Sequence, residues 1–165
     1  MLKRHLAFLV IFGLIGSAAF AAQRFDWTKE QVGKLRYGLT EREVEKTIPG
    51  KPKRLLEKFW AADGNYHQEW QYPDAGITLD MVSEKKGGPQ SIGSMTITSP
   101  STLKTQRGIG IGSTAAEVKE AYGRFRNDED SKDFGGFIAG SIYGGVMFDF
   151  DQGRVSRIFV GAAAE

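Results

Sequence analysis

The chain has 165 residues, with 22 Lys and Arg, 20 Asp and Glu, and no cysteine. This length allows one domain with one sizeable core. The lack of cysteine excludes disulfides, a thiolate nucleophile, a zinc–thiolate site and a lipid-modified N-terminal cysteine.

The first 21 residues have the pattern of a secretory signal peptide. Lys3, Arg4 and His5 precede an apolar run that is too short to span a membrane comfortably, and Ala19-Phe-Ala21 fits a cleavage site. We therefore expect a bacterial protein that is periplasmic or secreted, cleaved near Ala21 and left without a stable membrane anchor. Removing Lys3 and Arg4 leaves 20 basic and 20 acidic residues. This balance gives no electrostatic case for nucleic acid or an anionic membrane as a partner.

The rest of the chain reads as two tandem repeats, 22–99 and 107–165, joined by a linker over 100–106. Residues 38–48 align with residues 112–122 at a constant offset of 74. Thr40 with Glu43, and Thr114 with Glu117, each spell a capping box at the start of a short helix. Another possible capping box, Thr28 with Gln31, predicts a further helix over 29–35.

Alternating apolar residues predict antiparallel strands after each helix. The segments 76–81 and 94–97 in the first repeat correspond to 145–150 and 157–160 in the second. Less regular strands are expected over 55–60, 67–72 and 134–143. The predicted fold class is α+β: each repeat is a helix or helix pair followed by about three antiparallel strands. Because neither half has much core, we expect their sheets to be continuous or tightly apposed in one domain.

These features carry a resemblance to a known family. The stretch 27–50, with its Gly38-Leu-Thr40 entrance, resembles the start of the β-lactamase-inhibitor-protein-like fold, which also occurs in the SmpA/OmlA lipoprotein of outer-membrane barrel assembly. The duplication is more similar to the inhibitor, which has two repeats. The resemblance implies a helix-loop-helix packed on an antiparallel sheet, and binding to another protein as the usual activity. The chain departs from both groups, because it has neither disulfides nor a lipidated cysteine, and a fold alone does not transfer function.

The motifs for enzymes and cofactors are absent from the sequence. The glycines of 107–112 lack the lysine of a phosphate-binding loop and the spacing of a dinucleotide fingerprint. The acidic stretch 128–133 lacks the spacing of a calcium loop and reads as a solvated loop. His67 alone cannot build a typical zinc site or a serine-hydrolase triad, and it is interpreted as part of a solvated strand face. We therefore expect no catalytic residue, metal or cofactor.

The aromatic residues are the remaining signal. Many of them must fill the core, but the alternating apolar strands already supply one face of the sheet. We therefore predict an exported, non-enzymatic module that binds an envelope or secreted protein through an open sheet face, with five candidate contact residues: Trp60, Tyr66, Trp70, Tyr72 and Tyr143.

The alternative is a small-ligand-binding protein or hydrolase with a site between the repeats. Its polar groups would come from His67, Glu69 and one of two recurring aspartates, Asp80 and Asp149. For the two aspartates, hydrogen bonding at strand turns or pairing with a neighbouring Lys or Arg is the simpler interpretation.

Overall fold

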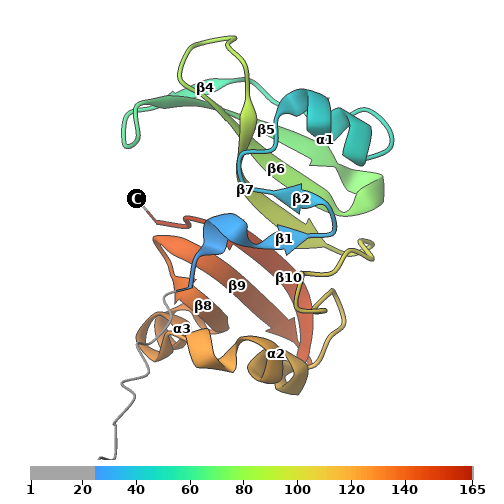
Figure 1. Ribbon diagram of the computed structural model, residues 1–165, viewed down its shortest axis with the longest axis vertical. Coiled ribbons are helices and arrows are strands. Elements are labelled where there is room, and N and C mark those ends of the chain that lie inside the picture. Colours follow the sequence, from blue (N-terminus) through green and yellow to red (C-terminus); the bar gives the residue numbers. More distant parts are fainter. Residues whose placement is uncertain (1–24, 165) are drawn as a thin grey trace, which may run out of the picture.

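The computed structural model describes residues 25–164, so the expected signal peptide lies outside the described residues. Eight strands form one mostly antiparallel sheet with the order β3-β5-β6-β7-β10-β9-β8, and β4 pairs with β5 beside β3 (Figure 1). The strands are β3 (Lys53–Arg54), β4 (Lys58–Trp60), β5 (Asn65–Tyr72), β6 (Ile77–Ser83), β7 (Ser91–Thr98), β8 (Phe137–Ser141), β9 (Gly144–Asp151) and β10 (Arg154–Gly161).

The sheet is continuous through its middle, which is one of the two arrangements that the sequence leads us to expect. β7 pairs with β10, with Ile97 opposite Ile158. Each of these strands is the last of a three-stranded antiparallel series, β5-β6-β7 on one side and β8-β9-β10 on the other. The α+β class with an antiparallel sheet is therefore confirmed.

Two helices begin at the predicted capping boxes. α1 (Glu41–Thr47) starts after Thr40, whose backbone N–H donates to the Glu43 carboxylate at 2.9 Å. α2 (Ala115–Tyr122) starts after Thr114, whose N–H donates to Glu117, and whose hydroxyl accepts from the Glu117 N–H. These reciprocal bonds satisfy amides that a helix start leaves unpaired.

The prediction of a helix over 29–35 is wrong. A short 3₁₀ turn, η1 (Trp27–Lys29), leads instead into a hairpin of β1 (Gln31–Val32) and β2 (Leu35–Arg36). The Thr28 hydroxyl donates to Asp26 rather than capping a helix. Burial of Val32 and Leu35 against the core decides the local structure in favour of the hairpin.

The acidic stretch is also not a loop. Residues 128–134 form α3 (Asp128–Phe134), and the Asn127 side chain accepts from the Asp130 N–H at its start. Acidic residues in the first turn suit the partial positive charge of a helix N-terminus. The remaining elements are two 3₁₀ turns, η2 (Pro73–Ala75) and η3 (Gly123–Phe125).

The core lies on one face of the sheet, beneath α1 and α2. Alternate strand residues point into it, so β6 contributes Ile77, Leu79 and Met81. The helices add Val44 and Val118, both fully buried. Within residues 25–164, no helix combines the length and apolar composition needed to cross a bilayer.

Candidate functional site

A cleft of about 1030 Å³ opens on the face of the sheet opposite the core. Its floor is made by the other alternate residues of the strands, including Thr78 and Asp80 of β6 and Thr96 of β7. Apolar side chains form its walls. They come from the β3–β4 region, from the N-terminal segment and from the end of β10: Leu55, Leu56, Trp60, Trp27, Tyr37, Phe159, Ala162 and Ala163.

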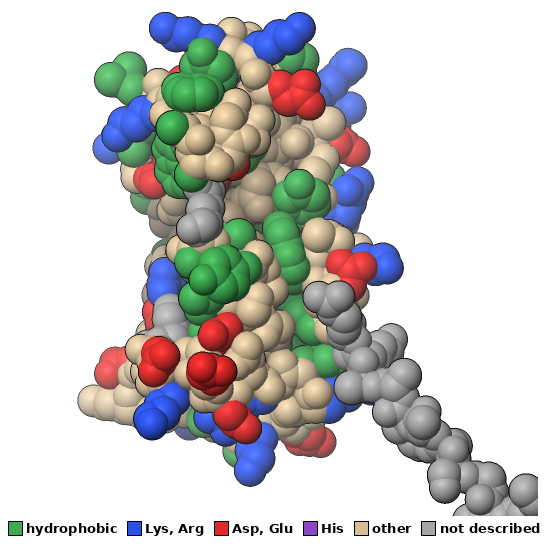
Figure 2. Space-filling view, turned by 90° about the vertical axis from the view of Figure 1, so that its left-hand side faces the viewer, with side chains coloured by type: hydrophobic (Ala, Val, Ile, Leu, Met, Phe, Trp, Pro, Cys, Tyr) green, Lys and Arg blue, Asp and Glu red, His purple; other side chains and the backbone are tan. Residues whose placement is uncertain are grey.

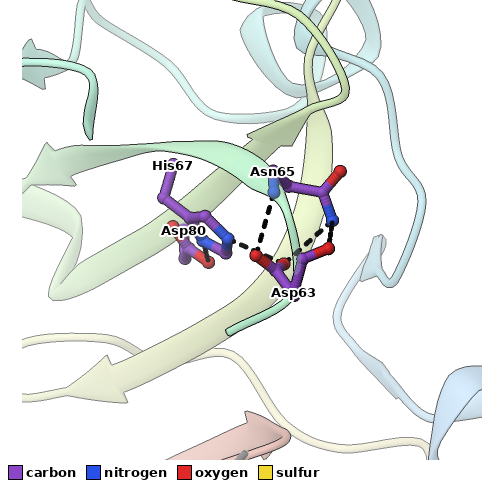
Figure 3. A network of polar contacts seen from close by, with 4 residues as sticks. All are labelled: Asp63, Asn65, His67 and Asp80. Carbon is purple, nitrogen blue, oxygen red and sulfur yellow. Dashed lines mark hydrogen bonds and ion pairs between the residues drawn. The ribbon is translucent and has the colours of Figure 1, made fainter. Parts of the chain in front are cut away.

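His67 lies in one wall of this cleft, between two carboxylates (Figure 3). Its Nδ1 lies 2.7 Å from an Asp80 oxygen on the adjacent strand β6. Its Nε2 lies 2.9 Å from an oxygen of Asp63, in the turn between β4 and β5. The same Asp63 carboxylate accepts from the Asn65 backbone and side chain. Only the imidazolium form has a hydrogen on both ring nitrogens, so this geometry holds histidine in its charged state.

The local electrostatics agree with that assignment. Burial by itself would lower the pKa of His67, but hydrogen bonds to Asp80 and Asp63 outweigh it and raise the pKa above 6.5. Partial burial would raise the pKa of Asp63, but hydrogen bonds from Asn65 and His67 lower it to about 2. The imidazolium therefore joins the turn before β5 to the middle of the sheet.

The stability contribution of His67 is expected to depend on pH. A raised folded-state pKa stabilises the fold fully below the unfolded value of 6.5, and the contribution is lost as pH rises through the folded value. The stabilisation that comes from the lowered pKa of Asp63 is fully present above the unfolded value of 3.8. It is lost as pH falls through about 2. The His67→Gln substitution should therefore cost more unfolding free energy at about pH 5.5 than at about pH 9. Urea titrations at both pH values test this, and equal costs would show that folding does not raise the pKa of His67.

Trp60 covers the imidazole from the cleft side. Its ring stacks on His67 with a centroid separation of 3.9 Å and an interplanar angle of 11°. The Trp60 ring is nevertheless 43% exposed, while His67 is 7% exposed. The interpretation of His67 as part of a solvated strand face is therefore wrong, because Trp60 shields it from water.

The other recurring aspartate has a different partner. Asp149 on β9 accepts a hydrogen bond from Arg157 Nε, directly across the ladder on β10. The expectation of pairing with a neighbouring Arg is thus met for Asp149, whereas Asp80 pairs with a histidine. Asp80, Arg157 and Glu69 all line the cleft, and Glu69 lies opposite Asp80 across the β5–β6 ladder.

The five predicted contact aromatics do not share one surface. Trp70 and Tyr72 are buried in the core, at 0% and 4% exposure, so they offer no accessible contact. Tyr66 is partly buried against Phe59. Trp60 lines the cleft, and Tyr143 is 67% exposed at the turn between β8 and β9. Strand alternation explains the error, because Trp70 and Tyr72 pair with the buried Leu79 and Ile77 of β6 and therefore lie on the core face of the sheet.

Sequence reasoning missed several residues of the cleft. The sequence predicts only an irregular strand at Leu55 and Leu56, and it gives Tyr37 no role. Asp63 was not singled out, although the pattern Asp63-Gly64-Asn65 between two strands is typical of a tight turn. Arg157 could not be singled out, because Arg154 is nearer to Asp149 in the sequence and only the irregularity between Val155 and Arg157 places Arg157 opposite it.

Comparison of the chain with family models, curated proteins and solved structures found no match. Among residues 25–164, no group of three or more His, Asp or Glu side chains is arranged to hold a metal ion.

Proposed function

We propose that this protein is a non-enzymatic binding module whose cleft receives a projecting segment of an envelope or secreted protein. The cleft itself carries the proposal: about 1030 Å³ of open space on the free face of the sheet, with exposed Trp60, Leu55 and Leu56 along one wall. Exposed aromatic and aliphatic side chains around a concavity are typical anchors for a partner's side chains.

The polar groups of the cleft support binding rather than catalysis. Both ring nitrogens of His67 face carboxylates, so the ring has no free lone pair with which to accept a proton from a substrate. Asp149 is held by Arg157. These pairs fix the wall and the floor of the cleft, a preorganisation that lowers the entropic cost of binding.

We further propose that the two halves of the chain, 22–99 and 107–165, are structural repeats of the β-lactamase-inhibitor-like kind. Three observations support this proposal. The two capping boxes keep the offset of 74 residues. Each helix is followed by a three-stranded antiparallel series. The sheet order β5-β6-β7-β10-β9-β8 is symmetric about the central β7–β10 pair: in each half the first strand of the series is outermost and the last is at the centre.

Site-specific crosslinking tests the proposed function. A photoreactive phenylalanine analogue is placed at Thr96 in the cleft floor, and a matched control at Ala116 on the exposed side of α2. The protein is expressed with its leader, 1–21, so that it meets its natural compartment. We expect the Thr96 variant, but not the Ala116 variant, to give one crosslinked protein product. No product from Thr96, or the same products from both positions, would contradict the proposal.

The alternative is a small-ligand-binding protein or hydrolase, and one observation favours it. One cleft is lined by four polar residues, as expected for a site between the two halves: His67, Glu69, Asp80 and Arg157. This alternative predicts no crosslinked protein, and a small molecule that co-purifies with the wild-type chain but is lost in the Glu69→Gln variant. Mass spectrometry of the extracted protein separates the two functions.

A further inference from the structure

The segment Lys51–Trp60, here called the basic arm, carries most of the exposed apolar surface. Six large hydrophobic side chains are exposed within residues 25–164, and four of them lie here: Leu55, Leu56, Phe59 and Trp60. Leu56 is 85% exposed and Phe59 is 56% exposed. Such a concentration on one projecting edge points to an interaction surface.

Cations surround these apolar side chains. The basic arm itself contains Lys51, Lys53, Arg54 and Lys58. Its one acid, Glu57, accepts from the Gly87 N–H, and this bond ties the arm to the β6–β7 loop, which carries Lys85 and Lys86. Arg54 is paired with Glu45 at 2.7 Å. Within residues 25–164, no carboxylate lies within ion-pair distance of the three lysines of the arm or the two lysines of the β6–β7 loop.

Residues 22–165 have 20 basic and 20 acidic side chains, but cations concentrate around the exposed hydrophobic residues of the basic arm. β4 and the β6–β7 loop form the upper end of the molecule in Figure 1, and basic side chains gather there with hydrophobic ones between them (Figure 2). The basic arm and the β6–β7 loop together carry six cations and only two acids, Glu57 and Glu84. This edge, rather than the whole end that also holds the glutamates of α1, therefore complements an anionic surface.

The apolar side chains of the basic arm lie on both of its faces. Trp60 lines the cleft and stacks on His67, whereas its neighbour Phe59 points to the opposite face, against Tyr66. One rigid protein surface would cover only one of these faces. A fluid lipid headgroup layer surrounds a projecting edge and contacts both.

We propose that the basic arm binds reversibly to an anionic phospholipid surface. Leu56, Phe59 and Trp60 enter the headgroup region, and the lysines contact lipid phosphates. Each lysine near an anionic membrane contributes about 1 kcal/mol, and indole rings prefer the interface between water and lipid. This is peripheral attachment through the folded domain, and it needs neither a spanning helix nor a lipid anchor.

Vesicle sedimentation tests the proposal, using the processed chain and vesicles of phosphatidylglycerol with phosphatidylcholine or of phosphatidylcholine alone. We expect binding to the anionic vesicles that weakens with salt, and little binding to neutral ones. Lys53→Gln combined with Lys58→Gln should weaken binding about 25-fold, from about fivefold for each lysine. The matched control, Lys119→Gln with Lys132→Gln on α2 and α3, removes the same charge far from the arm and should leave binding unchanged.

Fluorescence quenching locates the contact. Lipids with bromine on the acyl chains should quench part of the tryptophan emission, and this quenching should disappear in the Trp60→Phe variant while sedimentation persists. Absence of binding to anionic vesicles, equal loss in the control variant, or capture of an acidic protein by the arm without vesicle binding would each overturn the proposal. Crosslinking from Thr96 tests protein binding in the cleft independently of lipid binding by the basic arm. Either proposal can therefore fail while the other stands.

Discussion

Replacing Trp70 with alanine is expected to lower the free energy of unfolding by about 3–5 kcal/mol. Trp70 is the largest fully buried side chain of the core, and it lies on β5 between β3 and β6. Its indole N–H donates to Gln68 at 2.9 Å, and the Arg54 guanidinium lies 3.8 Å from its ring centroid. The substitution therefore leaves a cavity and removes two polar contacts at the same place.

The matched control for Trp70→Ala is Leu56→Ala. Leu56 lies close in sequence but is 85% exposed, so its truncation should change stability by no more than about 0.5 kcal/mol. Urea denaturation followed by far-ultraviolet circular dichroism measures both variants. A loss below about 1.5 kcal/mol for Trp70→Ala would mean that the core collapses around the missing ring or that the indole is not buried.

The burial of Trp70 and Tyr72 determines which aromatic substitutions can report on partner binding. Loss of partner capture in Trp70→Ala or Tyr72→Ala would report a damaged fold, because both side chains lie in the core. Trp60 and Tyr143 are exposed, so their substitution separates binding from stability. Trp60 is the more informative of the two, since it lines the cleft while Tyr143 lies at the turn between β8 and β9.

The regular parts of this fold are visible in the sequence because each has a local physical cause. Alternating apolar residues predict strands at 76–81 and 145–150, and β6 and β9 lie there. The capping boxes at Thr40 and Thr114 marked two helix starts because the bonds that define them span only three residues.

The misassigned segments are those in which distant residues decide. The Thr28–Gln31 pattern is compatible with a helix start, but Val32 forms a bridge with Thr105, more than seventy residues away, and the segment becomes a hairpin. At 128–134, the helix is supported by bonds from outside it. The Ser131 hydroxyl accepts from the Ile138 N–H of β8, and the Asp130 carboxylate accepts from the Ile142 N–H.

The candidate site was only partly predictable for the same reason. His67 could be selected from the sequence as the only histidine after the expected signal peptide, and Asp80 and Asp149 because they recur at matching strand positions. Their partners depend on strand register, which places His67 near Asp80 and Arg157 opposite Asp149. Register is a property of the assembled sheet, and Asp63 joins the group only through the turn before β5.

Gly76→Ala is expected to lower the free energy of unfolding by more than about 3 kcal/mol. Gly76 ends η2 with φ +63°, in the left-handed region where a side chain is strained. A Cβ atom there would lie 2.2 Å from the Thr98 carbonyl oxygen and 2.8 Å from the Ser101 nitrogen. Gly76 also accepts a hydrogen bond from the Thr98 N–H at 2.9 Å. The added methyl group would therefore separate β6 from the end of β7.

Gly64→Ala separates the two causes of this cost. Gly64 has φ +75°, but no atom lies within 4 Å of the position that a Cβ would occupy. Gly64→Ala therefore adds only the conformational strain, about 1 kcal/mol.

Urea denaturation of both variants gives the steric part of the cost as the difference between them. Equal costs would mean that the segment leaving β7, residues 98–101, moves aside for a methyl group. A much larger cost for Gly76→Ala, or its failure to fold beside a folded Gly64→Ala, would show that close backbone contact requires glycine here. That contact lies on the chain's path from β7 into the segment that leads to α2, so its disruption would act on both halves of the sheet.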